Sequence, residues 1–150
     1  MPVKAVLNFR VPTEPRFASV VRQAVSEFAG ANGIGRDDLA HFLTALGEAI
    51  ANAIEHAHSH HGITIDVRID RKAIVAKIED GGIGFTAVGL DAKLPDVDAE
   101  RGRGLAIMRR CSDIFTISSE PGGGTAIVIG RYLRKASANG SVSLPEAQLA

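Results

Sequence analysis

The spacing of apolar residues changes along this chain, and that change restricts the possible fold more than any other feature of the sequence. Residues 5–11 and 63–70 alternate apolar with polar side chains, which is the period of a strand with one buried face. The two segments between them, about 13–29 and 37–58, place apolar residues three and four positions apart, which predicts amphipathic helices. The chain therefore combines half-buried strands with helices that can cover one face of a sheet.

The first predicted helix has a start signal, and both helices have an apolar stripe. Thr13 offers an N-cap oxygen, and Pro15 is tolerated in the first turn. Glycines at positions 30, 33 and 35 end this helix. The stripes consist of Phe17, Val20, Val21, Ala24, Val25 and Phe28 in the first helix and of Leu39, Leu43, Leu46, Ile50 and Ile54 in the second.

The second half of the chain continues with strands and one long irregular stretch. Residues 73–78 form an apolar strand that follows 63–70 after a short polar joint, which predicts an antiparallel hairpin. Residues 80–103, rich in glycine and acidic residues, predict a long loop. The remaining elements are a short helix at about 105–111 and strands at about 114–118 and 125–133. This order predicts an α+β fold, a two-layer sandwich in which helices cover one face of a mostly antiparallel mixed sheet.

Composition limits the size and the setting of this fold. The chain has 150 residues with 17 basic and 17 acidic side chains, so we expect one domain over residues 1–135 and a small, polar, disordered tail over 136–150. One cysteine, Cys111, excludes an internal disulfide framework and fits a reducing, cytoplasmic setting. The balanced charge argues against direct binding of nucleic acid or an acidic membrane, and no segment approaches the ~20 apolar residues of a membrane span.

Three polar residues share one face of the second predicted helix. Glu48, Asn52 and Glu55 lie four and then three positions apart. Two carboxylates and an amide oxygen suit a Mg²⁺ ion that holds a nucleotide phosphate, because Mg²⁺ prefers oxygen ligands. One carboxylate can also act as a general base. The alternative is an ordinary solvated helix face, although an asparagine in mid-helix beside buried positions favours a functional role.

Three glycine-rich segments follow, and nine of the 16 glycines in the chain lie between Gly81 and Gly124. Segment 80–84 (DGGIG) follows an apolar strand, where a carboxylate can accept from an exocyclic amine and glycines admit a flat base. Segment 101–105 (RGRGL) begins the short helix, whose free N–H groups and arginines favour an anion. Segment 122–125 (GGGT) predicts a hairpin turn. Each segment alone also fits an ordinary turn or loop.

The order and spacing of these motifs are more specific than any one of them. They resemble the GHKL, or Bergerat, fold, the ATP-binding fold shared by gyrase, histidine kinases and MutL, over roughly residues 5–133. Within it, segment 48–56 and the compact length look like the anti-sigma-factor serine/threonine kinases. The resemblance implies ATP and Mg²⁺ as cofactors, a sigma factor and an anti-sigma-factor antagonist protein as partners, and a homodimer. The motifs are Glu48-x-x-x-Asn52, Asp80-x-Gly82-x-Gly84, Gly102-x-Gly104 and Gly124-Thr125.

The resemblance also implies a role for each matching residue. Glu48 is the catalytic carboxylate, which acts as a base or positions water, and Asn52 is the Mg²⁺ ligand. Asp80 accepts a hydrogen bond from the adenine amine and is supported by Thr125. The remaining positions line the nucleotide pocket or meet the phosphates: Gly82, Gly84, Arg103, Gly104 and Leu105.

Other functions stay open beside this one. A nucleotide-binding regulatory module that switches a partner without phosphorylating it has the same adenine site. A histidine-kinase-like ATPase domain has the same fold. His56 and His60, four positions apart, fit a metal site or, more simply, solvated residues at a helix end.

Overall fold

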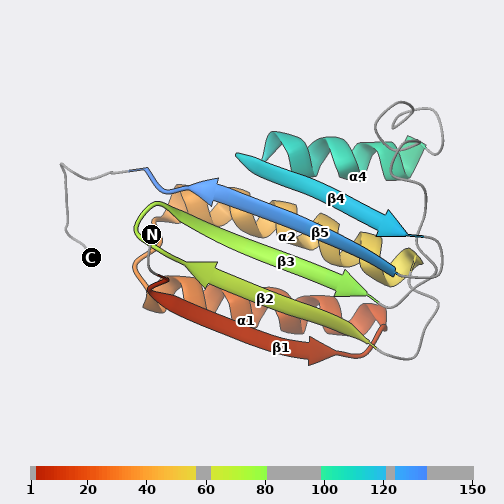
Figure 1. The fold of residues 1–150 in the computed structure, drawn as a ribbon, viewed down its shortest axis with the longest axis horizontal. Coiled ribbons are helices and arrows are strands. Elements are labelled where there is room, and N and C mark those ends of the chain that lie inside the picture. Colours follow the sequence, from red (N-terminus) through yellow and green to blue (C-terminus); the bar gives the residue numbers. More distant parts are fainter. Residues whose placement is uncertain (1–2, 57–61, 81–98, 121–123, 135–150) are drawn as a thin grey trace.

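The computed structural model describes residues 3–56, 62–80, 99–120 and 124–134, and Figure 1 shows how their helices and strands are arranged. All the strands that the apolar spacing predicts are confirmed, with ends that differ by one or two residues. In chain order the elements are β1 (Ala5–Val11), η1 (Pro15–Phe17), α1 (Ala18–Ala31), α2 (Arg36–His56), β2 (Ile63–Ile69), β3 (Ala73–Asp80), α4 (Ala99–Arg110), β4 (Ile114–Glu120) and β5 (Gly124–Tyr132).

The described strands form one sheet with the order β1–β2–β3–β5–β4. Each neighbouring pair in it is antiparallel, so this part of the chain holds none of the parallel pairs that a mixed sheet would contain. β2 and β3 form the predicted hairpin, and β4 and β5 form a second one. The pairing of β3 with β5 joins the two hairpins, and β1 completes the other edge of the sheet.

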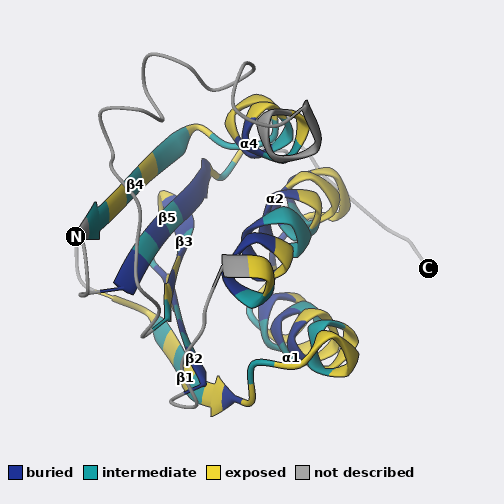
Figure 2. Cartoon of the chain, turned by 90° about the vertical axis from the view of Figure 1, so that its right-hand side faces the viewer, coloured by how far each residue is buried: buried dark blue, intermediate teal, exposed yellow. Residues whose placement is uncertain are grey.

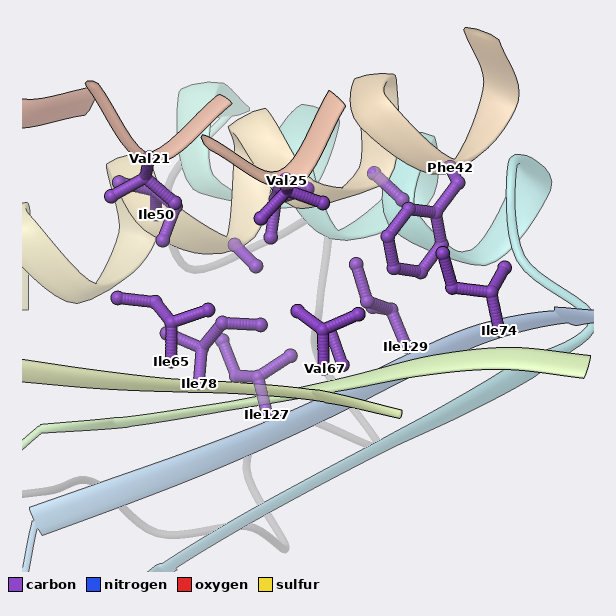
Figure 3. Close-up of a cluster of buried hydrophobic side chains, with 14 of the residues drawn as sticks. Val21, Val25, Phe42, Ile50, Ile65, Val67, Ile74, Ile78, Ile127 and Ile129 are labelled. Atoms are coloured by element: carbon purple, nitrogen blue, oxygen red, sulfur yellow. The ribbon is translucent and has the colours of Figure 1, made fainter. Parts of the chain in front are cut away.

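The α-helices α1, α2 and α4 lie on one face of this sheet, which confirms the two-layer prediction (Figures 1 and 2). α2 is the middle helix and contacts α1, α4, β3 and β5. Figure 3 shows side chains of the helices, such as Val25 and Phe42, above those of the sheet, such as Val67 and Ile129. Each of these four is at most 1% exposed, and burial of such a side chain contributes about 1.5–3 kcal/mol. The core therefore fixes α2, and with it the polar residues that α2 carries.

The predicted apolar stripes are confirmed except at Val20 and Ala24, and Ala24 is neither buried nor packed against the core. Val21 and Val25 of α1 and Leu46 and Ile50 of α2 are fully buried. Val20 was expected in the stripe of the first helix, but it is 49% exposed. Val21, the next residue and also a predicted member of the stripe, is buried as expected. The other predicted members pack against the core while partly exposed: Phe17, Phe28, Leu39, Leu43 and Ile54.

The first helix begins differently from the prediction. A 3₁₀ turn, η1, comes first, and the α-helix begins only at Ala18. Thr13 is not the N-cap, because Glu14 holds that position and no described group bonds the buried Oγ1 of Thr13. Pro15 explains the shift, since the residue before a proline is held in an extended conformation. Glu14 has φ −137° and ψ 137° accordingly.

The helix in the second half begins earlier than predicted. α4 begins at Ala99, so Arg103 and Gly104 lie in its second turn and not at a free helix N-terminus. The predicted helix start near Leu105 is therefore wrong, and the free N–H groups at the N-terminus of α4 precede Arg103 and Gly104 in the chain. Glycine costs about 1 kcal/mol in a helix relative to alanine, which is why the pattern predicted a loop. Burial of Leu105 and Met108 in the core offsets this cost.

None of the helices in the described ranges has the length and apolar character needed to cross a membrane.

Some predictions lie outside the described residues. The predictions without a structural description concern Gly82, Gly84, most of the loop 80–103, the histidines at 58, 60 and 61, and the tail 136–150.

Candidate functional site

The segments that carry the motifs meet at one end of the sheet. The last turns of α2, the end of β3, the start of β5 and the start of α4 all lie on the right of Figure 1. α2 contacts α4, β3 and β5 directly. The antiparallel pairing of β3 with β5 makes this convergence possible, since the end of one strand lies beside the start of the other. Residues that are far apart in the sequence therefore share one side of the molecule.

Glu48 and Asn52 lie one helical turn apart on α2, at the edge of its buried face. Asn52 is 8% exposed, whereas Glu48 is half-buried and Glu55 is exposed. Among the described residues, the side chains of Glu48 and Asn52 form no hydrogen bond. The amide oxygen of Asn52, at the edge of the buried face of α2, is therefore available to a ligand.

Gly104 of α4 lies directly against Glu48. A Cβ atom placed on Gly104 would be 2.9 Å from Oε1 of Glu48 and 4.0 Å from its Cδ. The next residue, Leu105, is 1% exposed and anchors α4 in the core, whereas Arg103 is exposed. The packing of α4 on α2 therefore brings Gly104 to Glu48 and leaves the Arg103 guanidinium on the solvent side.

Asp80 and Thr125 face each other across the ends of β3 and β5. They are partners in the register of the sheet, and the backbone N–H of Thr125 donates to Oδ1 of Asp80 over 3.3 Å. Thr125 is 5% exposed, and its hydroxyl donates to Oγ of Ser119 on β4 over 3.3 Å. The structure thus brings together two residues that the sequence motifs singled out and adds Ser119. Only the pairing of β4 with β5 could have indicated Ser119.

The oxygen atoms at this end of the sheet fit a magnesium ion bound with a phosphate. In the part of the chain that the structure describes, His, Cys, Asp and Glu side chains form no cluster of three or more that could hold a metal. Mg²⁺ does not need one, because it keeps several waters and takes one or two protein oxygens plus phosphate oxygens. The amide oxygen of Asn52, which has no hydrogen-bond partner in the described part of the chain and lies one turn from the Glu48 carboxylate, meets that requirement.

A second polar cluster lies at the opposite end of the sheet, and the motifs do not indicate it. Arg131 of β5 and Asp38 of α2 form an ion pair of 3.3 Å between Nη2 and Oδ1, with side chains only 8% and 7% exposed. The alternation along β5 could have found Arg131, since it has the same parity as the buried Ile127 and Ile129. The pair belongs to the support of the fold and not to the site around Glu48.

The fold and this end of the sheet define a class of protein: a two-layer α+β domain whose middle helix carries a carboxylate and an amide and packs against two strands and a further helix. A family model described as the histidine kinase-like ATPase domain matches residues 11–130. The chain belongs to this family.

Relatives within the family carry more specific names. The chain is 31% identical over 128 residues to an anti-sigma F factor of Bacillus velezensis, covering 80% of this chain and 87% of that protein. It is 27% identical over 141 residues to the serine-protein kinase RsbW of Staphylococcus aureus, covering 86% and 87%.

Two solved structures share the fold. A structure of the RsbU and RsbW domains of a Mycobacterium tuberculosis protein matches with a TM-score of 0.68 at 19% identity. The match covers 95% of this chain but 35% of that chain, which is much longer. A chain of the SiaB–SiaC complex from Pseudomonas aeruginosa matches with a TM-score of 0.63 at 14% identity, covering 85% and 89%. At these identities the likeness concerns the fold alone.

Proposed function

We propose that this protein is an ATP-dependent serine/threonine kinase that binds a sigma factor and phosphorylates an anti-sigma-factor antagonist. The observation that carries the proposal is the Glu48 and Asn52 pair on α2, without partners among the described residues and next to α4. The names of the relatives, anti-sigma F factor and serine-protein kinase RsbW, support the same proposed function.

Each site residue takes a part in this proposal. Asn52 would hold Mg²⁺ through its amide oxygen, and the ion would supply charge neutralisation at the phosphates of ATP. Asp80 accepts a hydrogen bond from the adenine amine, and the N–H of Thr125 fixes the orientation of that carboxylate. The remaining residues line the pocket or lie near the phosphates: Gly82, Gly84, Arg103, Gly104 and Leu105.

Glu48 is the catalytic carboxylate in this proposal. Its carboxylate accepts the proton of the substrate hydroxyl while the hydroxyl oxygen forms a bond to the γ-phosphorus and ADP leaves. Phosphoryl transfer of this kind depends mainly on positioning and on charge stabilisation. The half-buried location of Glu48 on a helix packed on both sides supplies that positioning.

The replacement Glu48→Gln tests the proposal. Glutamine keeps the size and removes the basic oxygen, so transfer of labelled γ-phosphate to an antagonist protein should fall by about 10²–10⁴-fold, the range of general-base catalysis. ATP affinity, measured by calorimetry with Mg²⁺, should be retained. Glu27→Gln is the matched control, because Glu27 is an exposed carboxylate on the neighbouring helix α1. Wild-type transfer by Glu48→Gln would exclude Glu48 as the base.

The partners and the setting form the second part of the proposal. We expect a homodimer in the cytoplasm, and the lone cysteine fits a reducing compartment. Light scattering measures the mass of the protein alone and with a candidate sigma factor. If the wild-type protein binds ATP and the sigma factor but never transfers labelled phosphate, it is a nucleotide-dependent switch module and not a kinase.

A further inference from the structure

Helix α4 passes so close to Glu48 that a side chain at residue 104 would meet the Glu48 carboxylate in its present position. An added Cβ would be 2.9 Å from Oε1 of Glu48, which is closer than packed atoms of this kind approach. Among the described residues, the Glu48 carboxyl group is the sole obstacle within 4 Å of that position. The glycine at 104 therefore leaves room for one particular group, and that group is the proposed base.

The atoms that an added Cβ at residue 104 would meet belong to the flexible end of the Glu48 side chain and not to the backbone. An alanine at 104 would therefore leave α2 and α4 in place and turn the Glu48 carboxylate away from its present position. Helix α4 itself would become more stable, because alanine is a better helix former than glycine. The space at residue 104 thus determines where the carboxylate of Glu48 lies and not whether the helix forms.

We infer that Gly104 is a positioning residue that sets the Glu48 carboxylate for proton transfer, an inference that rests on the proposed function. It gives Gly104 a role different from direct contact with the phosphates of ATP. Gly47 provides the contrast, since it precedes Glu48 on α2 and an added Cβ there would meet only Arg22, at 3.8 Å from Cδ and 3.9 Å from Nε. Those are ordinary packing distances.

The test compares Gly104→Ala with Gly47→Ala in three measurements: kcat for transfer, KM for ATP and the thermal unfolding midpoint. Gly104→Ala should lower kcat by on the order of 100-fold, the cost of misplacing a reacting group by about 1 Å. KM should stay unchanged and the unfolding midpoint should stay equal or rise. Gly47→Ala should keep the wild-type kcat.

A double variant shows whether Gly104 acts through Glu48. Glu48→Asp withdraws the carboxylate by one methylene group and makes room for a Cβ at 104. The change Gly104→Ala should therefore cause no further loss of kcat in the Glu48→Asp background. A full additional loss would overturn the inference, because independent effects add.

Other outcomes separate the inference from the proposed function. Wild-type kcat in Gly104→Ala, together with an inactive Glu48→Gln, overturns the inference and leaves the function standing. A raised KM at unchanged kcat, or a lowered unfolding midpoint, also overturns it in favour of a phosphate contact or a structural role. Wild-type transfer by Glu48→Gln overturns the assignment of the base itself.

A spectroscopic measurement tests the contact without any transfer assay. The ¹³C resonance of the Glu48 carboxyl carbon, assigned by its loss in Glu48→Gln, should shift in Gly104→Ala and stay in place in Gly47→Ala. An unchanged resonance in Gly104→Ala would show that residue 104 does not set the position of this carboxylate.

Discussion

The buried carboxylate of Asp38 connects three elements at the end of the sheet away from Glu48. It pairs with Arg131 over 3.3 Å and accepts the backbone N–H of Arg134 at Oδ2 over 3.0 Å. The Arg131 guanidinium in turn donates through Nη1 to the carbonyl oxygen of Cys111, just after α4. Because a charge removed from water is stabilised by an opposite charge beside it, the Asp38–Arg131 ion pair holds the start of α2 against the ends of β5 and α4.

Replacement of Asp38 by asparagine should destabilise the fold strongly. The change keeps the shape of the side chain but leaves the Arg131 guanidinium buried without a counter-charge, a loss of about 3–5 kcal/mol in the free energy of unfolding. Urea unfolding followed by circular dichroism measures it. Asp37→Asn is the control, because Asp37 is in the same first turn of α2 but exposed, and only its interaction with the helix dipole is lost. Equal effects of the two changes would contradict the prediction.

The turn between β2 and β3 is stabilised by the side chain of Asp70, which lies within it. Oδ1 of Asp70 accepts from the backbone N–H groups of Lys72 over 2.7 Å and of Ala73 over 2.8 Å. These two bonds hold the pKa of Asp70 below its ordinary value of 3.8. The short polar joint between two apolar runs was enough to predict this hairpin, because aspartate bonding to backbone groups two residues on is a local turn signal.

The lowered pKa makes this hairpin sensitive to acid. A carboxylate whose pKa is lower in the folded state contributes stability above the unfolded pKa, and this contribution is lost as the pH falls through the folded pKa. Asp70→Asn keeps the acceptor oxygen but does not titrate, so the loss of stability below about pH 4 should become shallower. Asp70→Ala should lower stability at neutral pH as well. Urea midpoints measured from pH 7 to pH 2 show both effects.

Part of the acid sensitivity should survive in Asp70→Asn. The hydrogen bond from Arg68 is the largest cause that lowers the pKa of Asp66, so this second carboxylate contributes with the same sign. An unchanged slope of stability against pH in Asp70→Asn would show that the turn does not depend on the charge of Asp70.

At the scale of the whole molecule, the sequence predicts the layers better than the contacts between them. Alternation along β1 or β2 is a local pattern, because each inward side chain is buried by the same two-layer packing. The start of α4 was missed because helix propensity counts Gly104 as a cost, whereas the gain comes from burial of Leu105 in a core made by distant segments. The contact of Gly104 with Glu48 was unpredictable for the same reason, since it arises from the packing of two helices.

The described fold and the proposed site should not need the chain beyond Lys135. Each described element and core residue lies before that point, including Arg134, whose N–H bonds Asp38. A variant that ends at Lys135 should therefore keep the thermal midpoint and the ATP affinity of the full chain. A variant that ends at Leu133 loses the Arg134 N–H donor, so Asp38 keeps only Arg131 and the midpoint should fall. Differential scanning fluorimetry with and without Mg-ATP measures both variants, and a clear drop in ATP affinity on ending at Lys135 would give the last residues a part in nucleotide binding.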